Sequence, residues 1–225
     1  MKLGKLSDFM RDIKLKPYVL IVGSGPSAQK VSAELNPKWA SITKGHSVII
    51  VNGAPDIEGA DVYMAFDKNC YKYEWYREGR AKHYLIGWEL AKQKPLDCDY
   101  YTFDYQPTMH KLMAHDFYCG SHQDAAAKWN ALADPKVLHG GGTITCCAYQ
   151  LAMKYHPKVI NMIGVEMTNG IWWDKQDPRA SKERHGVQPL NLLIHYAYDI
   201  LGIRTFHIGA TRLGCQEVDA EVFYD

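Results

Sequence analysis

A glycine turn near the start of the chain has the spacing of a phosphate-binding loop. Gly23, Gly25 and Ala28 follow the apolar run of residues 17–22 and satisfy the G-x-G-x-x-G/A fingerprint of dinucleotide-binding proteins. Glycines permit a tight turn there and let a phosphate approach backbone N–H groups at a helix start. The fingerprint also asks for an acidic residue about twenty positions later to hold a ribose, and Asn52 stands there instead. The turn therefore predicts a nucleotide site that departs from the standard dinucleotide pattern.

A second glycine turn occurs later in the chain. Residues 140–142 are all glycine and precede Thr143 and a helical pattern with small residues, after which the apolar residues 158–167 predict a strand. This order of glycine turn, helix and strand repeats that of the first turn. Near the end of the strand, Glu166 is placed to bind a metal, to orient a ribose or to cap the next turn, and these three roles stay open.

Residues 168–187 predict a long loop that could act as a lid. The stretch is polar, charged and interrupted by Gly and Pro, and a structureless loop of about twenty residues in a compact domain is usually functional or disordered. Trp172 and Trp173 must either pack onto the domain or cover a ligand. His185 is the residue type suited to act as a general base near neutral pH, and the neighbouring Arg184 could stabilise a leaving phosphate.

An aromatic group, Tyr71, Tyr73, Trp75 and Tyr76, lies between the predicted strands of residues 60–66 and 82–90. It could stack on a sugar or a pterin, although packing as a satellite of the core is the commoner outcome for such a group.

The elements that would position these residues alternate along the chain. We expect strands at 17–23, 47–54, 60–66, 158–167 and 203–210. Helices are expected at 26–35, between Thr143 and the strand at 158–167, and at 189–201, the last closed by Gly202. This alternation predicts one Rossmann-like domain over residues 1–225, an α/β fold with a doubly wound, mostly parallel sheet and helices on both faces. Ligands of such sheets bind outside the carboxyl ends of the strands, where both glycine turns, Asn52 and Glu166 would lie.

Composition limits the partners. The 26 Lys and Arg against 25 Asp and Glu create no field that would attract nucleic acid. No apolar run is long enough to cross a membrane and no signal peptide is apparent, so we expect a cytoplasmic protein. Residues 1–16 have a weak amphipathic pattern that favours docking on the domain over peripheral membrane contact. The six cysteines form no C-x-x-C pair and are expected to be buried thiols.

Several segments together resemble a known superfamily. The stretches "GSGPS", "VNGA", "GGGTITCCAYQLA", "VINMIGVEM" and "RHG" are similar in type and order to motifs of bacterial sialyltransferases that use CMP-sialic acid. The wider group includes motility-accessory glycosyltransferases and 6-hydroxymethylpterin pyrophosphokinase-like proteins. The middle third of the chain has no counterpart in this resemblance.

The resemblance implies roles for individual residues. His185 would be the base, and residues 168–187 the lid, with Trp172 and Trp173 replacing tyrosines that steady the leaving phosphate in the family. Ser24 replaces an asparagine that touches the nucleotide. Together with the glycine turns, the resemblance gives the following nucleotide-binding residues: Gly23, Ser24, Gly25, Pro26, Ser27, Asn52, Gly141, Gly142, Thr143 and Glu166.

The leading hypothesis is an inverting, nucleotide-sugar-dependent glycosyltransferase that uses a CMP-type donor and a glycan acceptor, with no covalently bound cofactor. One alternative is a Mg²⁺-dependent pyrophosphokinase acting on a pterin, in which Glu166 and Asp174 would hold the metal. A small NAD(P)- or flavin-binding oxidoreductase and a catalytically idle nucleotide-binding module are further alternatives. A homo-oligomer is also left open.

Overall fold

The computed structural model describes residues 3–31, 44–54, 57, 59–106, 132, 134–140, 143–167 and 187–219. Within these residues the strands are β1 (Leu3–Lys5), β2 (Tyr18–Val22), β3 (Ser47–Val51), β4 (Val62–Ala65), β5 (His83–Gly87), β6 (Tyr100–Gln106), β7 (Val137–His139), β8 (Val159–Ile163), β9 (Arg204–Ile208) and β10 (Gln216–Val218). The α-helices are α1 (Leu6–Asp12), α3 (Glu74–Arg77), α4 (Trp88–Gln93), α7 (Ile144–Lys154) and α8 (Val187–Leu201), and the 3₁₀ helices are η1 (Pro26–Val31) and η2 (Cys70–Lys72).

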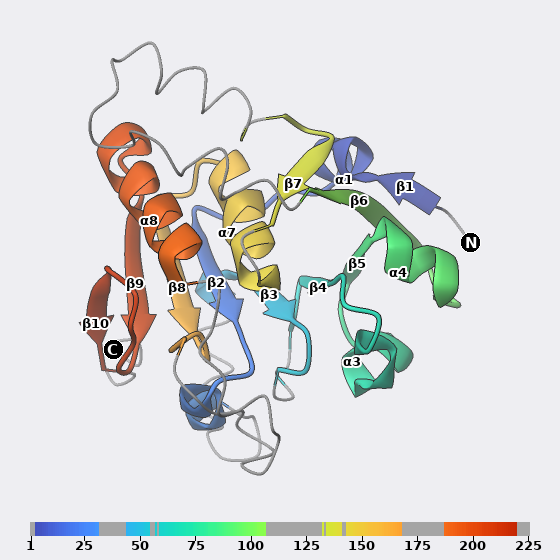
Figure 1. The fold of residues 1–225 in the computed structure, drawn as a ribbon, viewed down its shortest axis with the longest axis horizontal. Helices are drawn as coiled ribbons and strands as arrows, with labels where there is room; N and C mark the ends of the chain where they lie inside the picture. Colours follow the sequence, from blue (N-terminus) through green and yellow to red (C-terminus); the bar gives the residue numbers. More distant parts are fainter. Residues whose placement is uncertain are drawn as a thin grey trace.

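The strands form one parallel sheet, which confirms the predicted α/β fold. Their order is β1-β6-β5-β4-β3-β2-β8-β9-β10, and β7 pairs with β6 beyond the end of β1 (Figure 1). From β2 the chain winds outward through β3, β4, β5 and β6, and later returns to β8 on the other side of β2. The direction of winding therefore reverses between β2 and β8. In open α/β sheets the crevice outside the carboxyl ends at such a reversal is the usual ligand site.

The central strands are unbroken apolar runs because both of their faces are covered. In β2, Val19 and Ile21 pack on the side of α1, α7 and α8, whereas Leu20 and Val22 pack on the opposite side with Trp75 and other aromatic residues. All four side chains are fully buried. Two cores of this kind, one on each face, are what a parallel strand with helices on both sides requires.

The predicted helix after Pro26 has a different form. The structure has the 3₁₀ helix η1 over Pro26–Val31 rather than an α-helix from residue 26, and residues 32–35 lie outside the described part. The Ala28 N–H donates to the Gly25 carbonyl at 3.0 Å, the i→i+3 spacing of a 3₁₀ turn. At the other end of the chain, Gly202 closes α8 with a φ of +67°, as predicted.

The N-terminal segment contains a strand of the sheet as well as the expected helix. Leu3–Lys5 form β1, which pairs with β6, and the helical pattern begins at Leu6. Leu6 and Phe9 of α1 are buried against the sheet, so α1 docks on the domain as expected. Within the described residues, every helix is too short or too polar to traverse a bilayer.

Candidate functional site

A cavity lies outside the carboxyl ends of β2, β3 and β8, at the reversal point. Figure 1 shows the arrowheads of β2 and β8 pointing toward the same edge of the sheet. The described residues leave about 50 Å³ there, which is room for roughly four water-sized groups and much less than a whole nucleotide needs. The lining residues are Gly23, Ser24, Gly25, Val51, Asn52, Thr143, Ile144, Thr145, Gly164, Val165, Glu166 and Met167.

The first glycine turn is fastened to the end of β8 by its own backbone. The Gly23 N–H donates to the Ile163 carbonyl at 2.8 Å, and the Gly25 N–H donates to the Gly164 carbonyl at 2.7 Å. A Cβ on Gly23 would lie 2.3 Å from the Gly164 oxygen, so this close approach requires glycine. Because both N–H groups are engaged, neither is available to a phosphate. Ser24 lines the cavity, and its N–H meets no acceptor among the described residues.

Glu166 reaches into this turn from the end of β8. Its Oε1 accepts the Ser27 N–H at 2.5 Å, and its backbone carbonyl accepts the Arg212 N–H at 3.0 Å. The Thr211 hydroxyl lies 3.4 Å from the same carbonyl. A Cβ on Gly25 would lie 1.7 Å from Oε2, so the absence of a side chain there admits the carboxylate. The carboxylate thus occupies a place that a phosphate takes in a phosphate-binding turn.

This carboxylate dominates the charge of the cavity. Among the described lining residues, Glu166 is the one ionisable side chain, and it is only 7% exposed. A second negative charge about 4 Å away would be repelled by roughly 4 kcal/mol per unit charge near a protein surface. A phosphate in the inner part of the cavity would therefore be unfavourable without a cation.

Asn52 follows β3 in the left-handed backbone region, with a φ of 53°, which Asn tolerates better than most residues. Its Oδ1 accepts a hydrogen bond from the Cys70 thiol at 3.1 Å. Sequence reasoning missed Cys70, because no spacing pattern links it to Asn52. Asn52 also lines the cavity, where its amide can donate hydrogen bonds as well as accept them.

The start of α7 forms another wall of the cavity. Thr143 is the N-cap residue, and its Oγ1 accepts the Thr145 N–H at 3.3 Å. Ile144, in the first turn, has no helical acceptor for its N–H, and the aligned peptide dipoles make this end of α7 favourable for negative charge. The helix is eleven residues long and wholly buried, so its position is firmly set.

A buried histidine lies beneath Glu166. His207 of β9 is fully buried, and its Nδ1 lies 2.8 Å from the Gly209 carbonyl, which requires Nδ1 to carry the proton. Its Nε2 has no partner among the described residues. Burial lowers the pKa of His207 below its ordinary 6.5, while the Gly209 carbonyl and the Glu166 and Glu217 carboxylates oppose the shift. Burial therefore favours the neutral imidazole, and His207 is not among the described residues that line the cavity.

The cavity brings together part of the predicted site. Gly23, Ser24, Gly25, Asn52, Thr143 and Glu166 line it, and Pro26 and Ser27 follow directly in the same turn. The remaining predicted residues, Gly141, Gly142, Trp172, Trp173, Asp174, Arg184 and His185, and the lid up to residue 186, lie outside the described residues. His139, just before the second glycine turn, is buried, and its N–H donates to Gln150 Oε1 at 3.0 Å.

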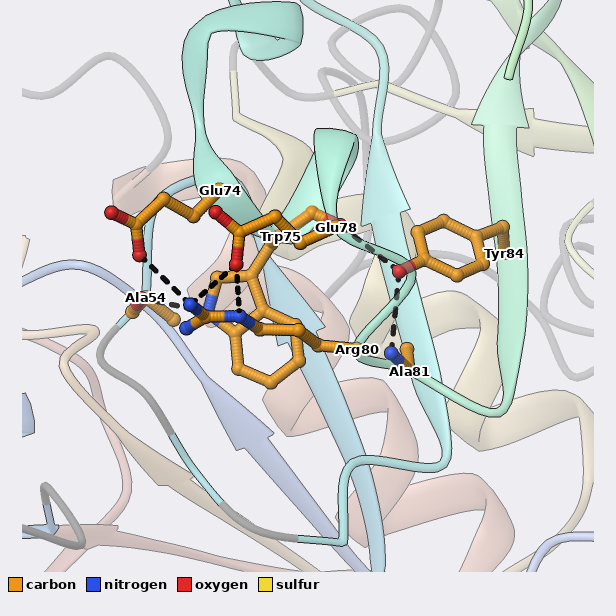
Figure 2. Close-up of polar contacts among 7 residues, drawn as sticks. All are labelled: Ala54, Glu74, Trp75, Glu78, Arg80, Ala81 and Tyr84. Atoms are coloured by element: carbon orange, nitrogen blue, oxygen red, sulfur yellow. Dashed lines mark hydrogen bonds and ion pairs between the residues drawn. The ribbon is translucent and has the colours of Figure 1, made fainter. Parts of the chain in front are cut away.

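The aromatic group is part of the core. Trp75 and Tyr76 are 3% and 5% exposed, and the Trp75 Nε1–H donates to the Ala54 carbonyl at 2.9 Å. Figure 2 shows the Tyr84 hydroxyl between Trp75 and Ala81; it donates to the Trp75 carbonyl and accepts the Ala81 N–H. At the rim, both Glu74 and Glu78 reach the Arg80 guanidinium, at 3.2 and 2.6 Å (Figure 2). These rings are occupied by packing, so the group is the expected satellite of the core.

Comparisons with protein-family models, curated proteins and solved structures found no match for this chain.

Proposed function

We propose that the protein is a nucleotide-sugar-dependent glycosyltransferase that holds the nucleotide of its donor at the β2–β8 reversal point. One observation carries the proposal: the loop after β2, Asn52, the end of β8 and the start of α7 converge on a single cavity. These are the segments that the resemblance to sialyltransferases marks as nucleotide contacts. Because the cavity is small, only one part of the nucleotide enters it, and the rest extends beyond the described residues.

Transfer needs a base to take the proton of the acceptor hydroxyl. Among the described lining residues the one ionisable group is Glu166, which is already bonded to Ser27. The resemblance to sialyltransferases makes His185 the base in this proposal, and a histidine is suited to that role near neutral pH. The acceptor oxygen would attack the anomeric carbon as the bond to the nucleotide phosphate breaks, and His185 would receive the acceptor proton. Arg184 and the start of α7 would stabilise the charge on the departing phosphate.

A Mg²⁺-dependent pyrophosphokinase is the second candidate, and the partnerless Glu166 Oε2 favours it. The described residues hold no group of three or more His, Cys, Asp or Glu side chains fit for a metal. Mg²⁺ would thus depend on substrate phosphates for several ligands, as it often does. The oxidoreductase alternative has less support, because the N–H groups of Gly23 and Gly25 are engaged.

The test is thermal stability in the presence of CMP, CDP, UDP, GDP, NAD(P)⁺ and ATP, each with and without Mg²⁺. A ligand that binds only the folded state raises the apparent stability by RT ln(1 + [L]/Kd), about 2.7 kcal/mol at a hundredfold excess over Kd. We expect CMP or another product nucleotide to stabilise the protein without metal. His185→Ala should keep this stabilisation and lose transfer from the matching nucleotide sugar. Stabilisation by ATP with Mg²⁺ alone would contradict the proposal in favour of the pyrophosphokinase.

A further inference from the structure

One oxygen of Glu166 has no hydrogen-bond partner in the described part of the chain. The side chain is more than nine-tenths buried, and its Oε2 is inaccessible to water in this structure and unbonded there. Burying a carboxylate oxygen without a donor is costly, and native proteins rarely leave one so unless a ligand or an ion completes it. Glu166 lines the cavity, so a ligand that enters there and uncovers this oxygen would find an acceptor without a partner.

The acceptor is rigidly placed. Ser27 holds its other oxygen, and Arg212 and Thr211 hold its backbone carbonyl. Contacts with two other segments of the chain reduce the entropy that Glu166 would otherwise lose on binding a ligand, which favours recognition of a defined group. Asn52 lines the same cavity, and its amide can supply donors to complement the acceptor of Glu166.

A hydroxyl group matches this pair, because it donates one hydrogen bond and accepts others. A phosphate does not, because it would bring acceptors and negative charge to a carboxylate. We propose that Glu166 selects the sugar of the nucleotide: it accepts hydrogen bonds from the ribose hydroxyls within the cavity and directs the phosphate toward the start of α7. The glycine turn after β2 is then a sugar-binding turn that carries its own anion. This inference rests on the proposed function, since it requires that a nucleotide bind.

The experiment compares CMP with 2′,3′-dideoxy-CMP by calorimetric titration of the full chain in EDTA. A hydrogen bond to a charged group is strong, so the wild type should bind CMP at least about tenfold more tightly than the dideoxy form. Glu166→Gln keeps an acceptor for the Ser27 N–H but replaces the charged acceptor with a neutral amide, so the preference should fall below about threefold. Glu217→Gln is the matched control. Glu217 is a carboxylate close to the same loops that bonds the Thr211 N–H at 2.9 Å, and its replacement should leave the preference unchanged.

The outcomes separate the two proposals. Equal binding of CMP and dideoxy-CMP by the wild type would overturn the role of Glu166 while leaving nucleotide binding intact. A preference that survives in Glu166→Gln, or that needs Mg²⁺, would also overturn it. Absence of binding by every nucleotide in the stability panel would remove the proposed function and this inference together. Equal binding by the wild type would overturn the role of Glu166 even if Glu166→Gln fails to fold.

Discussion

Two turns border the cavity, and they are built in opposite ways. The turn at Gly23–Ser27 uses its N–H groups internally, on the backbone after β8 and on the Glu166 carboxylate, and leads into the short 3₁₀ helix η1. The turn that ends at Thr143 leads into α7, a fully buried α-helix with a threonine cap. In the first turn the N–H groups of Gly23, Gly25 and Ser27 therefore all have acceptors, whereas the start of α7 presents the Ile144 N–H and the positive end of the helix dipole.

The difference shows that a glycine fingerprint does not by itself determine what the turn binds. Gly23 and Gly25 fit a phosphate-binding fingerprint, yet in this protein they let two backbones and a carboxylate come together. A fingerprint specifies backbone geometry, and the group that fills that geometry depends on residues far away in the sequence. Ser27 and Glu166 are separated by 139 positions. Substitutions on each side of the cavity test whether the two turns differ in this way.

The largest effect is expected for Gly23→Ala. A methyl group there would lie 2.3 Å from the Gly164 carbonyl oxygen, and because that atom is backbone, the turn and β8 must move apart. We expect a loss of about 2–3 kcal/mol in the free energy of unfolding, measured with urea. Gly45→Ala is the control, since a Cβ at the exposed Gly45 would meet no atom within 4 Å. Similar losses for both variants would show that the close approach at Gly23 is unimportant.

A smaller effect is expected in the pH dependence of the free energy of unfolding, through His207 near Glu166. His207 has a lowered pKa in the folded state because it is buried, so below its ordinary pKa of 6.5 the unfolded chain binds the proton more readily. The contribution of His207 to stability is thus present above pH 6.5 and is lost as the pH falls. Each pH unit in that range costs at most about 1.4 kcal/mol.

His207→Asn tests this, because the amide N–H can still reach the Gly209 carbonyl but does not titrate. The free energy of unfolding, followed by urea titration from pH 7.5 to 5.5, should fall less steeply for the variant than for the wild type. Parallel curves for the two proteins would mean that His207 is not the group responsible.

The smallest effect is expected at the second turn. Thr143→Ala removes the side-chain acceptor of the Thr145 N–H, and because that bond is long, at 3.3 Å, the loss should be about 0.5 kcal/mol, at the low end for N-caps. Thr143→Ser keeps the hydroxyl and should be nearly neutral. Thermal unfolding of the three proteins measures the difference. A loss larger than that of Gly23→Ala would reverse the order of the two turns.

Sequence patterns predicted those strands whose burial on both faces shows as an apolar run in their own residues. The runs that became β2, β3, β4, β8 and β9 are apolar because both faces are covered, and their places were predicted to within a few residues. The strands β1, β7 and β10 were missed. Each has three residues, pairs with one neighbour, and carries no apolar run of its own.

The site was predicted in outline for a related reason. The rule that ligands lie at carboxyl ends of strands brought Gly23, Asn52, Thr143 and Glu166 to one edge, where the cavity is. The bond from Ser27 to Glu166 could not be predicted, because it depends on which strand lies next to β2. The sheet order, not any local pattern, places β8 there.

The pairing of β2 with β8 also governs how the chain must be assembled. Val19 is the register partner of Ile160, so the centre of the sheet lacks one neighbour until most of the chain has left the ribosome. Until then β2 has an open apolar edge, which is a site for mispairing and aggregation. Long-range parallel pairing of this kind is intrinsically slow to form. The same junction that builds the cavity is thus completed late in folding, and a nascent chain of this protein has most need of chaperones before β8 is made.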